Sequence, residues 1–485
     1  MALPGRGFAP AAFARPGRCV EEPWQMTGLS TKMARWSKGF ALDAAPDQVI
    51  ENARLRILDI IGVMIASSGH ETVVAARAAQ ADADGGGRGA SELMRAQATS
   101  PAGAAFINGV ASAVLEFDDT HTVSNIHPTG VIVSASLPVA QSMGLSGRQW
   151  LEAVVVGSEL LCRIGLVSPV RMHEVGMHPT SVYGVFGAAY SVARLRGLSV
   201  EQTADAVGTA ASLSAGSIAS FEDGTSTKSL HVGFAAAAAI RAVALAAQGI
   251  SGPGRVFEGK FGWFRSHIQS EPEFRYSILT DELGEQWEVL NIAPKLYPCA
   301  YTLMPFISAA LSLREQHHID PEAVAEVRCE IMPRSFQTVC EPLSEKRRPL
   351  TSWHGRISLQ HTVAEALVLG RFDKSAYAPE SLRNPVINAL ADQVVHVADP
   401  IAAADISRSR GVVSIRFKDG REISHTVEDM LGTRSNPATQ ADYVRKFRAN
   451  VDGIVRPAEA DRLLDAMLDL DAVRRVDDIF AGIRT

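Results

Sequence analysis

The sequence predicts a mainly α protein, in which a large all-helical domain is joined to a second, smaller α+β domain. Helical periodicity continues to about residue 250, period-two alternation appears after about residue 290, and helical periodicity returns from Ala438 to Ile483. A chain of 485 residues with 46% hydrophobic content can bury more than one core. We expect the all-helical domain to comprise residues 29–290 and 431–485, and the smaller domain residues 291–430.

The predicted helices begin with an amphipathic segment that follows Pro46 and Asp47. Apolar residues recur there at the spacing of one buried helix face, at Ile50, Ala53, Ile57, Ile60, Ile61 and Met64. Alanine-rich segments follow, and alanine both favours helices and lets them approach closely. We expect these helices near residues 102–115, 131–143, 150–166, 182–195, 201–213 and 234–248.

The smaller domain is predicted from strand patterns. Apolar and polar residues alternate over 325–331 and 413–417, which is the period of a strand with one buried face. Asp419 and Gly420 supply a two-residue turn into a further strand at 422–427. Helices near 358–369 and 379–391 and a short strand at 394–397 complete the expected domain.

Composition excludes several classes of function. The net charge is −6 and the 47 basic residues are spread along the chain, so no nucleic-acid partner is expected. Five scattered cysteines without a CxxC pair argue against a disulfide framework or a zinc site and favour a reducing cytoplasm. No apolar run reaches the roughly 18 residues of a membrane helix. Residues 1–28 are expected to be a disordered extension, with an organelle transit peptide as the weaker alternative.

Two loops that share the tripeptide His-Pro-Thr are the first candidates for chemistry. The first loop holds Glu116, Asp118, Asp119, Thr120, His121 and His127. The second loop ends at His178 and Thr180, and each loop opens a predicted helix, whose free N–H groups attract a carboxylate while an imidazole moves a proton. From spacing alone, an acidic cap with surface histidines is the stronger interpretation of the first loop. Metal binding is a weaker interpretation than proton transfer, because HxxxH and CxxC spacings are missing.

Two lysines are the candidate cations. Lys228, in TSTKSLHVG, precedes the alanine-rich helix, and the hydroxyls beside it suit an anionic ligand; a solvated lysine in a helix cap is an equally good interpretation. A desolvated Lys228 is also a candidate base. Lys295 and Tyr297 lie at the junction of the domains, as residues of a cleft or of an ordinary hinge. Further cleft-facing candidates, for which a solvated charge run is the favoured interpretation, are Arg334, Glu341, Arg347 and His354.

Taken in order, five segments resemble the MmgE/PrpD family, which includes 2-methylcitrate dehydratase, cis-aconitate decarboxylase and iminodisuccinate epimerase. The segments are EFDDTHTVSNIHPTG (116–130), GMHPTSVYGVFGAA (176–189), TKSLHVGFAA (227–236), GISGPGRVFEGKFG (249–262) and KLYPC (295–299). The resemblance covers residues 30–480 approximately.

The resemblance implies a helical domain completed by the C-terminal tail, a smaller α+β lid domain, a homodimer, and a site in the cleft between the domains. It also implies a small anionic di- or tricarboxylate substrate and no organic cofactor. By motif match, the site holds Thr120, His127, His178, Lys228 and Lys295. The lysines then clamp the anion while His127 or His178 exchanges a proton.

Three positions depart from the family pattern. Glu116 stands where aspartate is common, and Ala300 and Met304 stand where histidines are common. A thioether cannot transfer a proton, so a reaction that needs an imidazole on the lid side is disfavoured.

The resulting hypothesis is a cytoplasmic lyase of the 2-methylcitrate dehydratase type. Its predicted catalytic residues are His127, His178 and Lys228. Its predicted substrate-binding residues are Glu116, Asp118, Thr120, Thr180, Lys295 and Tyr297, with no metal ligand. An epimerase or isomerase is the runner-up, and a decarboxylase ranks third. A catalytically silent carboxylate-binding homologue is the alternative outside the enzymes.

Overall fold

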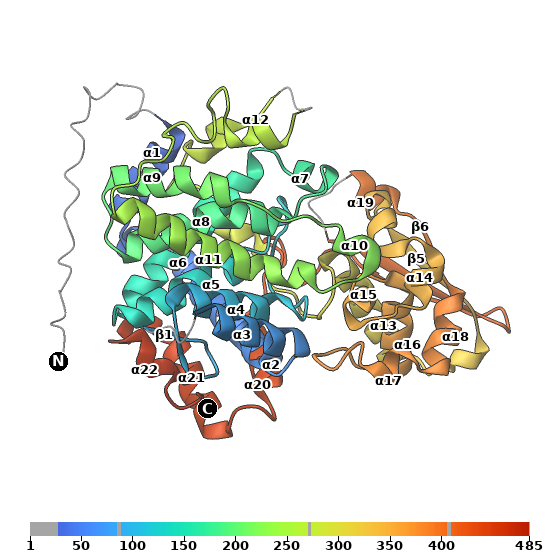
Figure 1. Cartoon of the computed structure of the whole chain (residues 1–485). Helices are drawn as coiled ribbons and strands as arrows, with labels where there is room; N and C mark the ends of the chain where they lie inside the picture. Colours follow the sequence, from blue (N-terminus) through green and yellow to red (C-terminus); the bar gives the residue numbers. More distant parts are fainter. Residues whose placement is uncertain (1–27, 85–88, 270–272, 405–408, 485) are drawn as a thin grey trace.

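The computed structural model describes residues 28–84, 89–269, 273–404 and 409–484, so the predicted N-terminal extension lies outside these ranges except for Gly28. The chain is mainly helical and has a smaller α+β part, which confirms the predicted fold class. One hydrophobic core draws on residues 33–292 and 447–483, and a second draws on residues 299–430. We call the parts around these cores the helical domain and the smaller domain (Figure 1).

Alanine-rich helices cross closely at the centre of the helical domain. Its helices are α1 (Leu29–Gly39), α2 (Asp47–Ser67), α3 (Glu71–Asp84), α4 (Pro101–Ala113), α5 (Pro128–Ser142), α6 (Gly147–Leu166), α7 (Arg171–Glu174), α8 (Pro179–Leu195), α9 (Val200–Ala210), α10 (Ser220–Asp223), α11 (Thr227–Ala247) and α12 (Trp263–His267). The strands β1 (Ala90–Ser91) and β2 (Ala98–Thr99) form a small antiparallel pair before α4. Capping boxes at Ser146 and Ser199 fix where α6 and α9 begin.

The helix α11 packs against α4, α5, α8 and α9 and begins earlier than predicted. It starts at Thr227 rather than near residue 234, so Lys228 lies in its first turn and not ahead of it. A Cβ on Gly109 of α4 would lie 2.4 Å from the Cα of Gly233, so two glycines let the helices approach. This tertiary contact overrides the weak helix propensity of the segment around Gly233.

The C-terminal segment returns to the helical domain. Its helices α20 (Gln440–Val451), α21 (Pro457–Leu468) and α22 (Val476–Phe480) contact α2 and α5 and lie away from the smaller domain (Figure 1). Lys446 on α20 forms a buried ion pair with Asp59 on α2 (2.7 Å). Residues nearly 400 positions apart in sequence therefore share one core.

Among the described residues, α11 is long and apolar enough to cross a membrane, and the bent pair α2 and α3 would be a second span if taken together. Half of the most apolar window of α11 is buried within the fold. That burial is what a core helix shows.

The smaller domain is a four-stranded sheet with helices packed on it. The strand order is β6 (Val394–Ala398), β5 (Val324–Ile331), β7 (Gly411–Phe417) and β8 (Glu422–Val427), with β5 and β6 parallel and the other pairs antiparallel. The helices are α13 (Met304–Gln316), α14 (Leu343–Arg347), α15 (Ser352–Gly355), α16 (Leu359–Leu369), α17 (Pro379–Leu382), α18 (Pro385–Gln393) and α19 (Pro400–Ala404). The helix predicted over 379–391 is two helices, because Pro385 starts a new one.

A two-residue strand pair joins the first His-Pro-Thr loop to the domain junction. The strand β3 (Thr120–His121) pairs antiparallel with β4 (Ile292–Ala293), and Thr120 lies opposite Ala293. Two residues after β4 the chain reaches Lys295. This pairing brings segments from residues 116–127 and 292–295 to one place.

Candidate active site

A cavity of about 320 Å³ lies between the two domains and collects the residues with acid-base chemistry. From the helical domain it is lined by Glu116, His127, His173, His178 and Lys228, and Lys295 reaches it from the junction. From the smaller domain the cavity receives Ala300, Arg334 and Arg410. Segments far apart in the sequence therefore form one polar site.

His127 is held in a single orientation by its own loop. Its Nδ1 lies 2.7 Å from the backbone carbonyl oxygen of Asp119 and 3.0 Å from Oγ1 of Thr120. A carbonyl oxygen only accepts hydrogen bonds, so Nδ1 of a neutral His127 carries the proton and Nε2 keeps its lone pair. The group that orients this base is therefore a backbone carbonyl and not one of the loop's carboxylates.

The two His-Pro-Thr turns lie side by side. His127 and His178 are the N-cap residues of α5 and α8, and each is followed by a proline in the first turn of its helix. The backbone N–H of His127 donates to Oγ1 of Thr180 (3.0 Å), and the two imidazole centroids are 6.2 Å apart. Both helix N-termini therefore open toward the same small volume, where they favour an anion.

His178 has a second histidine behind it. Its Nδ1 lies 3.1 Å from Nδ1 of His231, which is on α11, and the two rings are tilted by 38°. His178 lines the cavity between the domains, whereas His231 does not. Sequence reasoning gave His231 no role, although it follows Lys228 by three positions, a spacing that places both residues on one face of a helix.

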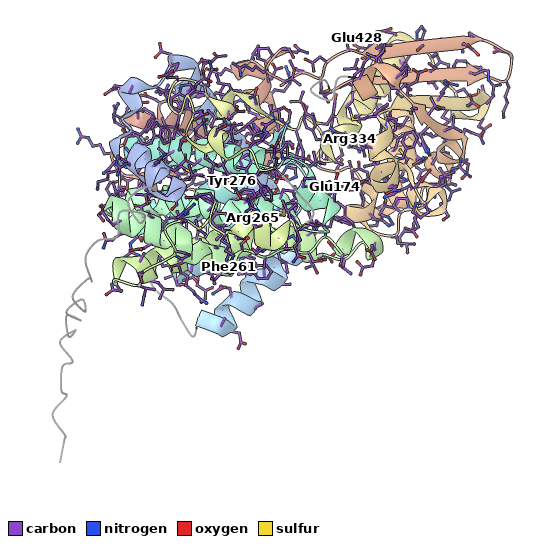
Figure 2. The ribbon with its side chains drawn as sticks, turned by 90° about the horizontal axis from the view of Figure 1, so that it is seen from above. Glu174, Phe261, Arg265, Tyr276, Arg334 and Glu428 are labelled. Atoms are coloured by element: carbon purple, nitrogen blue, oxygen red, sulfur yellow. The ribbon has the colours of Figure 1, made fainter. Side chains whose placement is uncertain are left out.

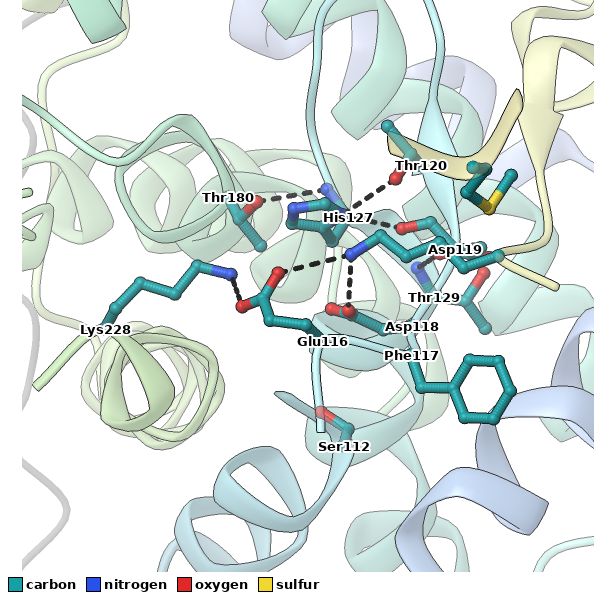
Figure 3. A network of polar contacts seen from close by, with 12 residues as sticks. Ser112, Glu116, Phe117, Asp118, Asp119, Thr120, His127, Thr129, Thr180 and Lys228 are labelled. Atoms are coloured by element: carbon teal, nitrogen blue, oxygen red, sulfur yellow. Dashed lines mark hydrogen bonds and ion pairs between the residues drawn. The ribbon is translucent and has the colours of Figure 1, made fainter. Parts of the chain in front are cut away.

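The two lysines share two buried carboxylates (Figure 3). Lys228 binds Glu116, and Nζ of Lys295 lies 3.3 Å from both Glu116 Oε2 and Asp118 Oδ1. Glu116 has a φ of 52°, a left-handed conformation that is uncommon outside glycine, at the exit of α4. That turn sends its carboxylate back between the two ammonium groups.

Burial and the two lysines set the charge of the site. Burial favours the neutral form of Glu116, but Lys228 and Lys295 outweigh it and hold the pKa of that carboxyl well below its usual range. Burial, followed by Lys295, lowers the pKa of His127 to about 4. Burial, followed by Lys228, lowers the pKa of His178 well below its usual value. At neutral pH both imidazoles are therefore uncharged bases, and the two lysines are balanced by two carboxylates.

The smaller domain contributes two arginines to the cavity, and they differ in their ion pairs. Arg410 is neutralised by Asp399 and by Glu428 (3.0 Å). Within the described ranges no carboxylate pairs with Arg334, which lies at the edge of the smaller domain that faces the helical domain (Figure 2). Arg334 lines the cavity and its side chain is also exposed, so the structure agrees with the favoured interpretation of a solvated charge as well as with a cleft-facing residue.

Several predicted residues lie outside the cavity lining. Three of them contact residues of the lining instead. Asp118 bonds to Lys295, Thr120 bonds to the ring of His127, and Thr180 accepts from the backbone N–H of His127. The prediction for Tyr297 is corrected, because its hydroxyl bonds to Ser308 (3.2 Å) and its ring packs in the smaller domain. Of the other proposed cleft residues, Glu341, Arg347 and His354 do not line the cavity either.

The two positions where a family histidine is replaced differ in their surroundings. Ala300 lines the cavity and leaves room there. Met304 is fully buried, and its sulfur accepts a hydrogen bond from the backbone N–H of Leu296 (3.3 Å). A proton donor is therefore missing from the cavity wall only at Ala300.

The described part of the chain has free cysteines and no group of residues arranged as metal ligands. Cys162, Cys299, Cys329 and Cys340 are buried free thiols. No three side chains of histidine, cysteine, aspartate or glutamate in these ranges are grouped as metal ligands would be.

Two family models match most of the chain. The model of the MmgE/PrpD N-terminal domain matches residues 31–275, and that of the MmgE/PrpD C-terminal domain matches residues 297–472. The boundary between the two matches falls beside Lys295, at the junction of the two hydrophobic cores.

Curated relatives are similar at low identity over long stretches. A cis-aconitate decarboxylase-like protein, oryM, of Aspergillus oryzae is 26% identical over 94% of this chain and 97% of its own length. A cis-aconitate decarboxylase of Aspergillus terreus is 25% identical over 93% of this chain and 94% of its own length. A 2-methylcitrate dehydratase of Salmonella typhimurium is 24% identical over 76% of this chain and 79% of its own length.

Proposed function

Because the chain belongs to the MmgE/PrpD family, we propose that it is a lyase of the 2-methylcitrate dehydratase type. It removes an α-proton from a small di- or tricarboxylate and eliminates a β-substituent. One observation carries the proposal: His127 is a neutral imidazole whose Nε2 lone pair is free, beside the ammonium groups of Lys228 and Lys295. Removal of a proton next to a carboxylate requires a base and nearby positive charge.

In the proposed reaction, Nε2 of His127 takes the α-proton, and the electron pair of the C–H bond moves toward the adjacent carboxylate. Lys228, Lys295 and the N-termini of α5 and α8 stabilise the negative charge that develops there. The C–O bond at the β-carbon then breaks. The departing hydroxide takes a proton from Lys228 or from the His127 imidazolium and leaves as water. His178 is the second base, for a substrate that presents its proton to that ring.

The position of Arg334 supports a substrate that has a further carboxylate away from the one beside the lysines. Lys228 and Lys295 are compensated by Glu116 and Asp118, while Arg334 brings an uncompensated charge from the opposite wall. A second carboxylate that faces Arg334 would complete the pairing. The cavity volume of about 320 Å³ fits a small polycarboxylate.

Proton exchange in heavy water tests this proposal. The protein is incubated with a panel of di- and tricarboxylates, and NMR follows deuterium at the α-carbon and the growth of an alkene signal. We expect both for at least one substrate, and we expect His127→Gln to abolish both. His121→Gln is the matched control, because His121 is in the same loop but bonds to Ser124 and Glu288 instead of facing the cavity.

The other outcomes of this experiment separate the alternatives. Exchange with inversion and no alkene identifies an epimerase. Binding in a thermal-shift assay without exchange for any compound identifies a silent carboxylate-binding homologue and overturns the lyase proposal.

A cis-aconitate-type decarboxylase is the second candidate, and the comparisons favour it. The decarboxylase of Aspergillus terreus aligns with 93% of the chain, whereas the dehydratase of Salmonella typhimurium aligns with 76%. Decarboxylation leaves a carbanion that must be protonated, and Ala300 supplies no proton donor. Release of labelled carbon dioxide from carboxyl-labelled cis-aconitate would select this candidate over elimination.

We also propose that the protein is a homodimer. Leu245, Ile250 and Phe261 are large apolar side chains of the helical domain with exposed fractions of 40%, 50% and 89%. A second copy would remove some of this surface from water. Light scattering after size-exclusion chromatography tests the proposal, and a monomer mass at micromolar concentration would contradict it.

A further inference from the structure

We propose that His178 and His231 form a two-ring proton relay, which connects the cavity between the domains with a second cavity on the other side of the pair. The inference rests on the proposed function, because the relay would carry away, or return, the proton that His178 exchanges with the substrate as the second base of that proposal. His231 is in this view a positioning and relay residue, since it contacts His178 and not the substrate.

The relay is built on a direct bond between two ring nitrogens. Nδ1 of His178 and Nδ1 of His231 are 3.1 Å apart, and the ring centroids are 5.2 Å apart. An imidazole nitrogen either donates or accepts, so one ring carries its proton on Nδ1 and the other carries it on Nε2. If His178 donates, its Nε2 is a free base on the side of the first cavity.

His231 lines a second cavity, separate from the one between the domains. A cavity of about 230 Å³ is lined by His231 together with Ser181, Gly216 and Phe234, and it shares none of these residues with the cavity between the domains. Phe234 is 51% exposed, so this second cavity lies at the surface of the helical domain. The histidine pair therefore lies between two spaces, one for substrate and one open toward water.

The loop that contains Gly216 packs closely against the histidine pair. Gly216 accepts a hydrogen bond from the backbone N–H of His178 (2.8 Å) and has a φ of 147°. A Cβ at this position would lie 2.7 Å from Cβ of Ser181 and 3.6 Å from Nδ1 of His231. A residue larger than glycine would collide with Ser181, and the φ of 147° also favours glycine, so this position holds the loop close to Ser181 beside the histidine pair.

The proton path balances without another reagent. Nε2 of His178 takes a proton, the Nδ1 proton of His178 passes to Nδ1 of His231, and His231 releases its Nε2 proton into the second cavity. One proton has then moved from substrate to water, and each ring has changed tautomer. The reverse sequence returns a proton and restores the starting tautomers.

The surroundings keep both rings uncharged at rest. His178 faces Lys228, His231, His127 and His173, and burial followed by these neighbours lowers its pKa well below the usual value. Burial, followed by Lys228, lowers the pKa of His231 to about 4. A neutral pair can pass a proton in either direction, whereas a pair that already held a cation would resist a second charge.

The first test needs no substrate. Protein labelled with ¹⁵N in histidine, with His178→Gln and His231→Gln for assignment, reports by NMR which ring nitrogen carries each proton. We expect opposite tautomers, with one of the two rings protonated at Nδ1. Two rings that are both protonated only at Nε2 would overturn the relay, whatever activity the protein has.

The second test is kinetic. We expect His231→Gln to lower kcat by about 10- to 100-fold with KM unchanged, as loss of a proton-transfer group does. We expect His231→Ala to regain rate when imidazole is added, in proportion to the neutral imidazole present, because the second cavity opens to the surface. Phe234→Leu is the matched control, since it changes the wall of the same cavity without removing a titratable group.

The outcomes separate the relay from the lyase proposal. A kcat of His231→Gln within twofold of the native value would contradict the relay. So would a loss that imidazole does not restore and that accompanies a lower Tm, because that pattern indicates a structural role. Absence of exchange with every carboxylate would contradict the lyase proposal, and the tautomer measurement would still decide the state of the histidine pair.

Discussion

Nδ1 of His127 lies 2.7 Å from the backbone carbonyl oxygen of Asp119. The contact fixes the proton of the imidazole on Nδ1, because the carbonyl oxygen does not ionise and can only accept a hydrogen bond. The ring therefore offers the same nitrogen, Nε2, to the cavity at every pH at which it is neutral.

The pH dependence of catalysis should reflect this neutral base. Burial, followed by Lys295, lowers the pKa of His127 to about 4, so the base form persists well below the usual histidine range. We expect kcat/KM to lose activity near pH 4 and not near pH 6.5, after correction for titration of the substrate. A profile from pH 4 to 8 checks this, and an acidic limb centred near 6.5 would contradict it.

Stability should fall as the solution is acidified from about pH 6.5 toward 4. His127, His173 and His231 each have a folded pKa of about 4, below the ordinary value of 6.5, so the unfolded chain binds more protons in this window. Asp119, whose pKa burial raises to about 6, works in the opposite direction, as do Asp59 and Glu159, whose pKa values burial also raises. The histidines whose pKa burial lowers outnumber these carboxyls, because His70, His178 and His354 belong to them as well. Urea unfolding at pH 7 and pH 5 measures the difference, and His173→Gln should make it smaller.

The two lysines should differ in what they contribute. Lys295 is fully buried between Glu116 and Asp118, so Lys295→Met leaves carboxylates without their cation and should destabilise the fold by about 3–5 kcal/mol. Lys228→Met should cost less stability, because Glu116 keeps Lys295, yet should lower kcat/KM by at least about 100-fold. Equal urea midpoints for the two variants would contradict this distinction.

Arg334 should determine affinity for substrates with several carboxylates. It lines the cavity without a carboxylate partner in the described part of the chain, so Arg334→Gln should raise KM by about 10-fold or more and change kcat little. Arg334→Lys keeps the charge and should recover part of the loss. The kinetic constants for a dicarboxylate and a tricarboxylate provide the check, and equal KM values in native and Arg334→Gln protein would remove Arg334 from binding.

The glycine contact between α4 and α11 should be sensitive to a single methyl group. Gly109→Ala would place a Cβ 2.4 Å from the backbone of Gly233, and overpacking of this kind costs about 1–3 kcal/mol. Gly39→Ala is the control, because a Cβ there meets nothing within 4 Å and alanine favours a helix by up to about 1 kcal/mol. Urea denaturation of both variants tests the pair, and destabilisation by Gly39→Ala would contradict the argument.

Local patterns predicted the fold well where one face of an element is buried. The alternation over 325–331 and the turn at Asp419 and Gly420 correspond to β5 and to the β7–β8 hairpin. The start of α11 was predicted too late, because the contact between Gly233 and Gly109 is tertiary and leaves no mark in the local pattern. The pairing of β3 with β4 could not be predicted either, since two residues carry no periodicity.

The candidate site was predicted from motifs and not from geometry. The motif match named Thr120, His127, His178, Lys228 and Lys295; the last four line one cavity, and Thr120 bonds to His127 outside the lining. The roles of their neighbours depend on long-range contacts that spacing does not encode. The Nδ1 contact between His178 and His231 is an example, because it joins two residues that are 53 positions apart in sequence.

The short pairing of β3 with β4 ties part of the cavity wall to the helical domain, while the rest of the wall belongs to the smaller domain. Thr120 is bonded to His127 and is paired through β4 with the segment that carries Lys295, and Glu116 of the same loop binds both lysines, so the base and both ammonium groups are connected to the helical domain. Arg334 belongs to the smaller domain. A hinge movement between the two cores would thus alter the distance from Arg334 to His127 while the proton-transfer geometry stayed assembled, which separates capture of the anion from the chemistry performed on it.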